Sequence, residues 1–183
     1  KRLQALADAR KKCFSGDYSR LQRARLSMVE IERPKEAAIF RKYVRLFKDM
    51  YANQQGLLIY GPNGTGKSFS VAALCNELID TGHEVKFTTF ARIDQELGAG
   101  TRADRKTYID SLNDYALLVL DDLGAERRSE YMQELVFSVI DSRYTSGKPV
   151  VITTNLTLQD LKNPQTAQPI NPATGFGTSA ATR

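Results

Sequence analysis

Near the middle of the chain stands the sequence Gly61-Pro62-Asn63-Gly64-Thr65-Gly66-Lys67-Ser68. It follows the short apolar run Leu57-Leu58-Ile59-Tyr60 and leads into residues 67–80, which have helical composition. A loop of the pattern G-x-x-x-x-G-K-[ST] between a strand and a helix is typical of sites that bind the phosphates of nucleoside triphosphates. The glycines let successive backbone N–H groups turn toward phosphate oxygens at the positive end of the helix. The sequence therefore predicts a nucleotide-binding domain.

The loop also predicts which residues hold ATP or ADP together with Mg²⁺. We expect the ammonium group of Lys67 to reach the β- and γ-phosphates, and the Ser68 hydroxyl to ligate Mg²⁺. The predicted nucleotide-binding set comprises Gly61, Pro62, Asn63, Gly64, Thr65, Gly66, Lys67, Ser68 and Phe69. Taken alone, the loop does not distinguish ATP from GTP.

Two acidic residues, Asp121 and Asp122, follow the apolar residues 117–120. Such a run predicts a buried strand, and in a parallel sheet the carboxyl ends of the strands form the edge where ligands bind. We expect Asp121 to hold the Mg²⁺ shell through water, and Asp122 to orient and deprotonate the water that attacks the γ-phosphate. The alternative, acids that merely end a strand, is disfavoured by the phosphate-binding loop.

Asn155 follows the β-branched residues 150–154, which predict a further strand ending at the same edge. A neutral amide at this place can hydrogen-bond both the γ-phosphate and the attacking water. An asparagine after a strand is more often a turn residue, but the two preceding motifs favour a role in sensing the nucleotide. We therefore group Lys67, Asp122 and Asn155 as catalytic candidates.

Apolar runs that alternate with helical segments indicate the fold class. The expected strands are residues 57–60, 85–90, 117–120 and 150–154, and the expected helices are residues 35–53, 67–80, 91–97, 103–113 and 129–146. Strands spaced by helices form βαβ units, so the sequence predicts an α/β fold with a parallel sheet covered on both faces. We expect a basic N-terminal linker and helical segment (1–34), a core (35–163) and an irregular or disordered tail (164–183).

Charge is distributed unevenly along the chain. The net charge is +5, yet residues 1–48 hold 14 Lys and Arg against 5 Asp and Glu. This asymmetry favours a polyanion or an acidic partner, and the alternative is a solvated basic helix face. A single histidine, His83, argues against a histidine zinc site or a Ser-His-Asp triad. No membrane span or signal peptide is expected, and the cytoplasm is the expected compartment.

Three segments carry a family resemblance: GPNGTGKS at 61–68, LLVLDDLGAER at 117–127 and DSRYTSGKPVVITTNLTLQDL at 141–161. At these separations the chain resembles the AAA+ ATPases of the DnaC/DnaI helicase-loader family over residues 13–163. The resemblance implies an AAA+ P-loop fold, a hexameric replicative DNA helicase and single-stranded DNA as partners, and self-association through AAA+ contacts. It also implies a primosomal role in DNA replication, with a separate helicase-gripping N-terminal domain.

The resemblance assigns roles at the site and marks a departure from the family. Lys67, Ser68 and Asp121 match its nucleotide and Mg²⁺ positions, Asn155 matches its first sensor, and Asp122 stands where many AAA+ proteins have the longer Glu. Family members continue with an arginine that acts on a neighbour's ATP and another near the C-terminus, whereas Arg183 is the only basic residue after residue 163 here and nothing in that segment matches the family's pattern. The C-terminal part is therefore expected to be incomplete or altered, with nucleotide bound far better than it is hydrolysed.

A predicted DNA-binding set follows the second strand and comprises Phe90, Arg92, Arg102, Arg105 and Lys106. Phe90 would stack a base and the cations would contact phosphates. The alternative is an ordinary exposed helix whose cations pair with neighbouring carboxylates.

Arginines near the helix 129–146 are a further set to weigh. Arg127, Arg128 and Arg143 are candidates for contact with a neighbouring subunit's nucleotide, although an ordinary structural role is the stronger expectation.

Three functions remain open at this point. The first is a replicative helicase loader, which is favoured by Lys12-Cys13-Phe14 and by residues 87–92. The second is an IstB-type transposition helper ATPase, which shares the same core and binds duplex DNA and a transposase. The third is a nucleotide-binding fragment with little hydrolysis, so whether this chain is an ATPase in its own right stays open.

Overall fold

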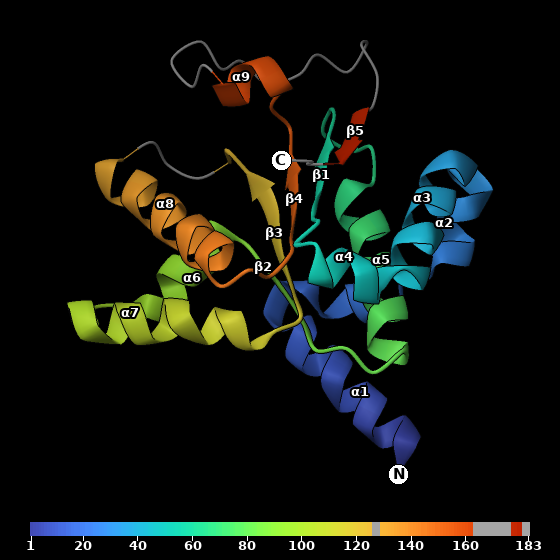
Figure 1. The fold of residues 1–183 in the computed structure, drawn as a ribbon, viewed down its shortest axis with the longest axis horizontal. Helices are drawn as coiled ribbons and strands as arrows, with labels where there is room; N and C mark the ends of the chain where they lie inside the picture. The colour runs from blue at the N-terminus through green and yellow to red at the C-terminus, as the bar shows by residue number, and fades with distance from the viewer. Residues whose placement is uncertain (126–128, 163–176, 181–183) are drawn as a thin grey trace.

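The computed structural model describes residues 1–125, 129–162 and 177–180. Within these residues one sheet has the strand order β2-β3-β4-β1-β5 (Figure 1). The strands β1 (Leu57–Tyr60), β2 (Val85–Thr88), β3 (Leu117–Leu123) and β4 (Val150–Thr154) pair in parallel. The predicted α/β class with a parallel sheet is confirmed.

Helices cover both faces of this sheet (Figure 1). Before β1 lie α1 (Arg2–Cys13), the 3₁₀ helix η1 (Gly16–Arg23), α2 (Leu26–Glu32), α3 (Pro34–Arg45) and α4 (Phe47–Ala52). Between and after the parallel strands lie α5 (Lys67–Asp80), α6 (Phe90–Leu97), α7 (Arg102–Ser111), η2 (Leu112–Asp114), α8 (Glu130–Thr145) and α9 (Leu158–Lys162). The described residues include no helix of the length and apolarity that a membrane crossing requires.

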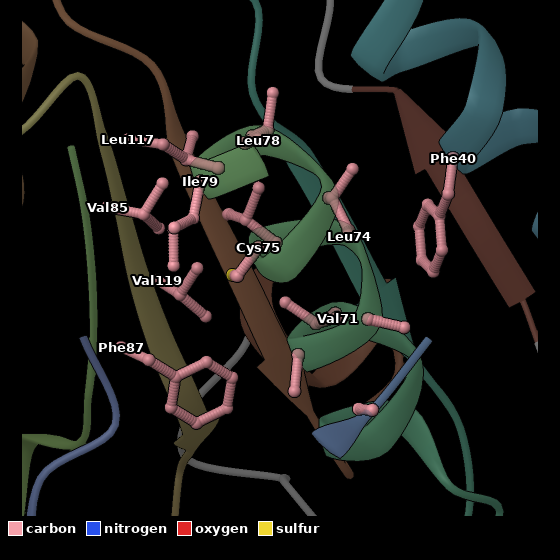
Figure 2. Close-up of a cluster of buried hydrophobic side chains, with 14 of the residues drawn as sticks. Phe40, Val71, Leu74, Cys75, Leu78, Ile79, Val85, Phe87, Leu117 and Val119 are labelled. Atoms are coloured by element: carbon pink, nitrogen blue, oxygen red, sulfur yellow. The ribbon is translucent and has the colours of Figure 1, made fainter. Parts of the chain in front are cut away.

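Strand β3 shows how the two faces are made. Leu117 and Val119 pack on the side of α5, whereas Leu118 and Leu120 pack on the side of α6 and α8, because successive side chains of a strand point to opposite faces. All four are fully buried, as expected for a central strand of a covered parallel sheet. Figure 2 shows the first face, where the apolar residues of α5 lie against Val85, Leu117 and Val119. Buried Leu or Val side chains contribute about 1.5–3 kcal/mol each.

Two predicted elements differ from those observed. The expected helix 35–53 breaks at Leu46, whose φ of −100° and ψ of 17° separate α3 from α4. The expected strand 85–90 ends at Thr88, because the Thr89 hydroxyl accepts a 3.2 Å hydrogen bond from the backbone N–H of Arg92 and thereby caps α6. Phe90 therefore begins a helix instead of ending a strand.

The N-terminal segment shares the core of the α5 face. Cys13, Phe14 and Leu26 are buried in the same cluster as Leu74 of α5. The ring of Phe14 lies 5.5 Å from that of Phe87 in β2. The segment therefore packs as part of the domain, and it places η1 beside the carboxyl end of the sheet.

The tail differs from the sequence-based expectation over four residues. An irregular segment was expected at 164–183, yet Gly177–Ala180 form β5, which pairs antiparallel with β1. The outer edge of β1 presents backbone N–H and C=O groups that any extended segment can pair, whatever its side chains. The rest of the expected tail, residues 164–176 and 181–183, lies outside the described residues.

Candidate nucleotide-binding site

A cavity of about 720 Å³ lies at the carboxyl edge of the sheet, where the predicted ligand edge was placed. Its walls come from η1, the loop 61–69, the segments after β2 and β3, and the residue after β4. The predicted residues that line it are Asn63, Gly64, Gly66, Lys67, Ser68, Phe69, Asp121, Asp122 and Asn155. Three separate sequence motifs thus meet around one volume.

The loop 61–69 is curled by two glycines and one internal hydrogen bond. Gly64 and Gly66 have φ angles of 76° and 77°, a left-handed conformation that disfavours side chains with a Cβ. Gly66 is also the N-cap of α5, so the positive end of that helix faces the cavity. The Thr65 hydroxyl donates a 2.8 Å hydrogen bond to the carbonyl of Pro62 and closes the curl. Gly61, Pro62 and Thr65 thus shape the loop from behind.

Lys67 is folded into its own loop. Its Nζ donates hydrogen bonds to the carbonyl oxygens of Gly61 and Pro62, both at 2.9 Å, and to Oδ1 of Asn155 at 2.6 Å. The residue is 6% exposed, and burial lowers the pKa of its ammonium group, although the carboxylates of Asp121 and Asp122 act in the opposite direction. A buried cation held by neutral oxygens is well placed to take an anionic phosphate as a stronger partner.

Asn155 connects Lys67 to the acidic residues. Its Nδ2 donates a 2.7 Å hydrogen bond to Oδ1 of Asp122, while its Oδ1 accepts from Lys67. An ammonium group can only donate and a carboxylate can only accept, so these two partners fix the orientation of the amide. The three catalytic candidates therefore form one continuous chain of hydrogen bonds.

A β-bulge displays the two acids. The pairing of β3 with β4 shifts register between Leu120 and Leu123, and Asp122 takes a φ of 60°. A bulge bends the strand locally and re-aims its side chains, and Asp is among the residues that tolerate positive φ. Asp121 and Asp122 both line the cavity as a result, although neighbouring residues of a regular strand point to opposite faces.

Thr153 fastens this bulge, a role that sequence reasoning did not assign to it. Its hydroxyl donates a 2.6 Å hydrogen bond to Oδ1 of Asp121 and accepts one of 2.8 Å from the backbone N–H of Asp122. Asp121 is 3% exposed, and burial raises the pKa of its carboxyl group, against the hydrogen bonds from Thr153 and Ser68. The sequence did contain a signal for this role, because Thr153 is a hydroxyl-bearing residue near the end of the strand that pairs with β3.

Ser68 and Asp121 suit Mg²⁺ by their chemistry. Both residues line the same cavity, the Ser68 hydroxyl is near enough to lower the pKa of the Asp121 carboxyl group, and oxygen ligands are those that Mg²⁺ prefers. No group of three or more His, Cys, Asp or Glu side chains that could hold a metal occurs in the described part of the chain. Mg²⁺ here would depend on waters and phosphate oxygens to complete its octahedron, as it does in nucleotide sites.

Three residues of η1 line the cavity without having been predicted. They are Tyr18, Arg20 and Leu21, which the sequence placed in a linker. The Tyr18 hydroxyl faces the Asp121 carboxylate, and burial together with Asp121 raises the pKa of Tyr18 to about 12. The residues lie at least forty positions before the loop 61–69, and their packing on α5 brings them to the site.

The predicted DNA-binding set is divided by the structure. Phe90 contributes to the wall of the first cavity, but it is 1% exposed and packs among Ile93, Leu120 and other residues of the second core cluster, so it has no free face on which a base could stack. Arg92 donates to Oε1 of Glu96 at 3.0 Å and to the carbonyl of Ser15 at 2.6 Å, which ties α6 to the N-terminal segment. Phe90 therefore cannot stack a base as predicted, and the Arg92 guanidinium is already paired with protein groups.

The other three cations lie together on α7. Arg102, Arg105 and Lys106 line a second cavity, of about 590 Å³, with residues of α8. The guanidinium of Arg105 lies 4.6 Å from the ring centroid of Tyr131. Among the described residues, the predicted set forms one ion pair with a neighbouring carboxylate, between Arg92 and Glu96. The carboxylate of Asp104 instead accepts hydrogen bonds from Thr101 and caps the start of α7.

Arg143 has a structural role. It is 1% exposed and donates to the carbonyl oxygens of Pro149, Leu112 and Ala116 at 3.0–3.2 Å. A guanidinium enclosed in this way cannot reach a neighbouring subunit's nucleotide. The other two candidates, Arg127 and Arg128, lie outside the described residues.

Comparison with known proteins agrees with the family resemblance of the sequence motifs. A family model of the IstB-like ATP-binding proteins matches residues 35–167. The replicative helicase loader DnaC of Escherichia coli (strain K12) is 30% identical over 126 residues, which cover 66% of this chain and 49% of DnaC. An insertion-sequence ATP-binding protein of Sinorhizobium fredii (strain NBRC 101917 / NGR234) is 32% identical over 105 residues, 57% of this chain and 35% of that protein. The crystal structure of DnaI matches with a TM-score of 0.63 at 26% identity, covering 78% of this chain and 77% of the DnaI chain.

The matched region contains the loop 61–69, both acids and Asn155. The chain spans about half the length, or less, of the curated relatives it matches. The resemblance to DnaC/DnaI helicase loaders that the motifs indicated is confirmed, and so is the P-loop AAA+ fold. The chain therefore belongs to the family of IstB-like ATP-binding proteins.

Proposed function

We propose that this chain is the ATP-binding part of a loader that helps to place a hexameric replicative DNA helicase on single-stranded DNA during replication, in the cytoplasm. The observation that carries the proposal is the hydrogen-bonded chain from Lys67 through Asn155 to Asp122. It joins the group expected to bind the phosphates to the group expected to hold the attacking water. Such a chain can pass the state of the γ-phosphate to the rest of the protein, which is what an ATP-dependent switch requires.

Each residue of the site has a defined task in this proposal. Lys67 binds the β- and γ-phosphates, and Ser68 with Asp121 holds Mg²⁺, which when bound neutralises charge on the phosphates. Asp122 accepts a proton from the attacking water, and Asn155 orients that water and the γ-phosphate. An arginine supplied by a neighbouring subunit is worth several orders of magnitude in rate. Arg183 is the only basic residue after residue 163, and it does not match the family's trans-acting position, so we propose nucleotide binding with little hydrolysis.

The α7–α8 groove is the best candidate for the DNA surface among the described residues. Arg102, Arg105 and Lys106 supply positive charge there, and Phe137 of α8 lines the same groove with 69% of its surface exposed. Phe137 thus replaces the buried Phe90 as the aromatic residue on which a base would stack. Carboxylates of α8, among them Glu134 and Asp141, line the opposite wall, so the phosphates would follow α7.

Helicase capture tests the proposal. Tagged chain is mixed with the replicative helicase of the host, with ATP and Mg²⁺, with ADP, or without nucleotide, and the retained helicase is quantified. We expect retention that depends on the nucleotide, and loss of that dependence in Lys67→Ala. If the same amount of helicase is retained in all three conditions, or if none is retained, the proposed nucleotide-dependent switch is wrong.

A transposition helper of the IstB type is the second candidate. It is favoured by the match to the insertion-sequence ATP-binding protein of Sinorhizobium fredii. Such a protein would prefer duplex to single-stranded DNA and would bind a transposase instead of a helicase. Competition between a duplex and a single strand of the same sequence separates the two candidates, since the loader is expected to retain the single strand.

A further inference from the structure

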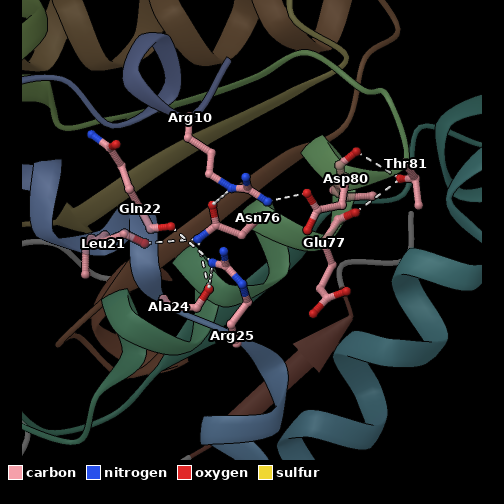
Figure 3. Close-up of polar contacts among 10 residues, drawn as sticks. Arg10, Leu21, Gln22, Ala24, Arg25, Asn76, Glu77, Asp80 and Thr81 are labelled. Atoms are coloured by element: carbon pink, nitrogen blue, oxygen red, sulfur yellow. Dashed lines mark hydrogen bonds and ion pairs between the residues drawn. The ribbon is translucent and has the colours of Figure 1, made fainter. Parts of the chain in front are cut away.

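The N-terminal segment is fastened to α5, the helix that begins with Lys67 and Ser68. Asn76 of α5, which has no exposed surface, donates 3.0 Å hydrogen bonds to the carbonyl oxygens of Leu21 and Ala24. Its Oδ1 accepts from Nε of Arg10 at 3.2 Å, and Arg10 also pairs with Asp80 (Figure 3). One buried amide therefore holds α1 and η1 against the helix of the phosphate-binding loop.

The hydrogen bonds of Asn76, which we call the Asn76 clamp, hold η1 so that Tyr18 lies at the nucleotide site. Its ring lies 5.0 Å from that of Phe87 in β2, which fixes its direction. Its hydroxyl is close enough to Asp121 for that carboxylate to help raise the pKa of Tyr18, and both residues line the same cavity as the loop 61–69. A phenolic hydroxyl is a donor at neutral pH, and a carboxylate is an acceptor, so the contact has the polarity of a hydrogen bond.

Three hydroxyl groups from separate parts of the chain lie beside Asp121, and that of Thr153 donates a 2.6 Å hydrogen bond to its Oδ1. Thr153 belongs to β4, Ser68 to the phosphate-binding loop and Tyr18 to η1. Ser68 is the one expected to turn toward Mg²⁺, which leaves Thr153 and Tyr18 to hold the carboxylate from the protein side. Partners that orient a metal-binding group in this way typically affect metal affinity about 10–100-fold.

We propose that Tyr18 is a positioning residue for Asp121. The helix η1 is then part of the nucleotide site, and its position changes when nucleotide and Mg²⁺ bind. The inference rests on the proposed nucleotide site. It extends that site to a segment outside the residues that the family model matches. Through the Asn76 clamp, any displacement of Tyr18 on binding is passed to α1, which projects from the body of the domain (Figure 1).

The test removes only the hydroxyl. Tyr18→Phe keeps the ring on Phe87, and binding of mant-ATP is measured by fluorescence across a Mg²⁺ titration. We expect the Mg²⁺ concentration for half-maximal binding to rise about 10–100-fold, with Mg²⁺-free binding within about two-fold of wild type. The matched control is Tyr43→Phe, which loses a buried hydroxyl that donates to the carbonyl of Gln55 at 2.8 Å. Tyr43 is absent from the walls of the nucleotide cavity.

Trypsin provides a second readout that does not depend on turnover. In the wild type, Mg²⁺ with mant-ATP should slow cleavage after Arg20 and Arg23 of η1, and in Tyr18→Phe this protection should be lost. Tyr43→Phe should behave as wild type in both measurements even if its unfolding midpoint falls.

The outcomes separate the two proposals. If the wild type binds mant-ATP with Mg²⁺ dependence and Tyr18→Phe does so equally well, the role of Tyr18 is overturned while the nucleotide site stands. If the wild type itself shows no Mg²⁺-dependent binding, the nucleotide site is overturned and the role of Tyr18 with it. A Mg²⁺ shift of equal size in Tyr43→Phe would assign the effect to lost stability and also overturn the inference.

Discussion

The side-chain amide of Asn155 donates a 2.7 Å hydrogen bond to the carboxylate of Asp122. The two residues follow neighbouring strands, β4 and β3, and they meet because the bulge at Asp122 turns its side chain toward the cavity. The same amide accepts from Lys67, so a change at any of the three is expected to reach the other two.

Lys67→Ala should remove nucleotide binding. Among the described residues the Lys67 ammonium is the one buried cation that lines the cavity, since Arg20 of the same lining is exposed, and its charge-assisted contacts with phosphate oxygens would be lost. We expect the affinity for ATP with Mg²⁺, measured by titration calorimetry, to fall at least about 100-fold. Lys35→Ala, at an exposed position of α3, is the control, and comparable affinity in both variants would contradict the assignment.

Asp122→Asn should separate binding from hydrolysis. Asn tolerates the φ of 60° at this position and can still accept from Asn155, so the site keeps its shape. It cannot take a proton, and loss of a general base costs about 10²–10⁴-fold in rate. Phosphate release under single-turnover conditions should fall accordingly from an already slow wild-type rate, with ATP affinity within about three-fold. A variant that hydrolyses as fast as the wild type would remove Asp122 from the mechanism.

Asn76→Ala should loosen the N-terminal segment. The change abolishes three hydrogen bonds and leaves the carbonyl oxygens of Leu21 and Ala24 with one donor each, the backbone N–H of Ala24 and the guanidinium of Arg25. We expect a loss of about 2–4 kcal/mol in the free energy of unfolding, measured by urea denaturation. Cleavage by trypsin at the N-terminal arginines should also accelerate. Asn53→Ala, at an exposed asparagine, should change neither measurement by more than a small amount.

Glu36 predicts a pH dependence of stability. Its side chain is 6% exposed, its Oε1 has no hydrogen-bond partner among the described residues, and burial raises its carboxyl pKa above the usual 4.5, against a hydrogen bond from Ser70 and the charge of Arg33. The folded state therefore binds this proton more tightly than the unfolded state. The protonated Glu36 carboxyl therefore stabilises the folded state at low pH. This contribution is lost as the pH rises from about 4.5 through the pKa that Glu36 has in the folded state.

Glu36→Gln removes that titration. The variant should lose less stability than the wild type between pH 4 and pH 7, with a difference in slope of at most about 1.4 kcal/mol per pH unit. Urea denaturation at several pH values measures it, and Glu32→Gln, at an exposed position, is the control. Parallel stability curves for wild type and Glu36→Gln would show that the buried carboxyl does not titrate as inferred.

The α7–α8 groove predicts a salt-dependent DNA affinity. Arg102→Glu with Lys106→Glu should weaken binding of a fluorescent oligo(dT) and flatten its dependence on salt, because fewer counterions are released. Phe137→Ala should cost about 1–3 kcal/mol of binding with the salt slope unchanged, since stacking carries no charge. Tyr144→Ala, an exposed aromatic residue of α8 that does not line the groove, is the control. Affinity that stays constant from low to high salt would exclude phosphate contacts.

Local pattern was enough to predict the parallel sheet and the loop 61–69. Buried strands such as residues 117–120 are continuous apolar runs, and the glycines at 64 and 66 report directly on backbone conformation. The bulge at Asp122 was not predictable, because it depends on how β3 pairs with β4 and leaves no mark in the sequence of either strand.

Residues that reach the site from elsewhere could not be predicted either. Tyr18 stands in a segment of weak periodicity, and its direction depends on Phe87 and Asn76, which lie far along the chain. Phe90 was misplaced for a related reason. The cap at Thr89 ended the strand early and turned the ring into the core.

The shared core of the N-terminal segment and α5 means that the region matched by the family model and the folding unit of this protein have different limits. The family match begins at residue 35, yet Phe14, Leu21, Leu26 and Val29 cover one side of α5. At about 1.5–3 kcal/mol for each buried side chain, their removal would cost an amount comparable to the whole stability of a typical domain. A polypeptide cut at the homology boundary would keep every motif by which the family is known and would be expected to aggregate instead of fold.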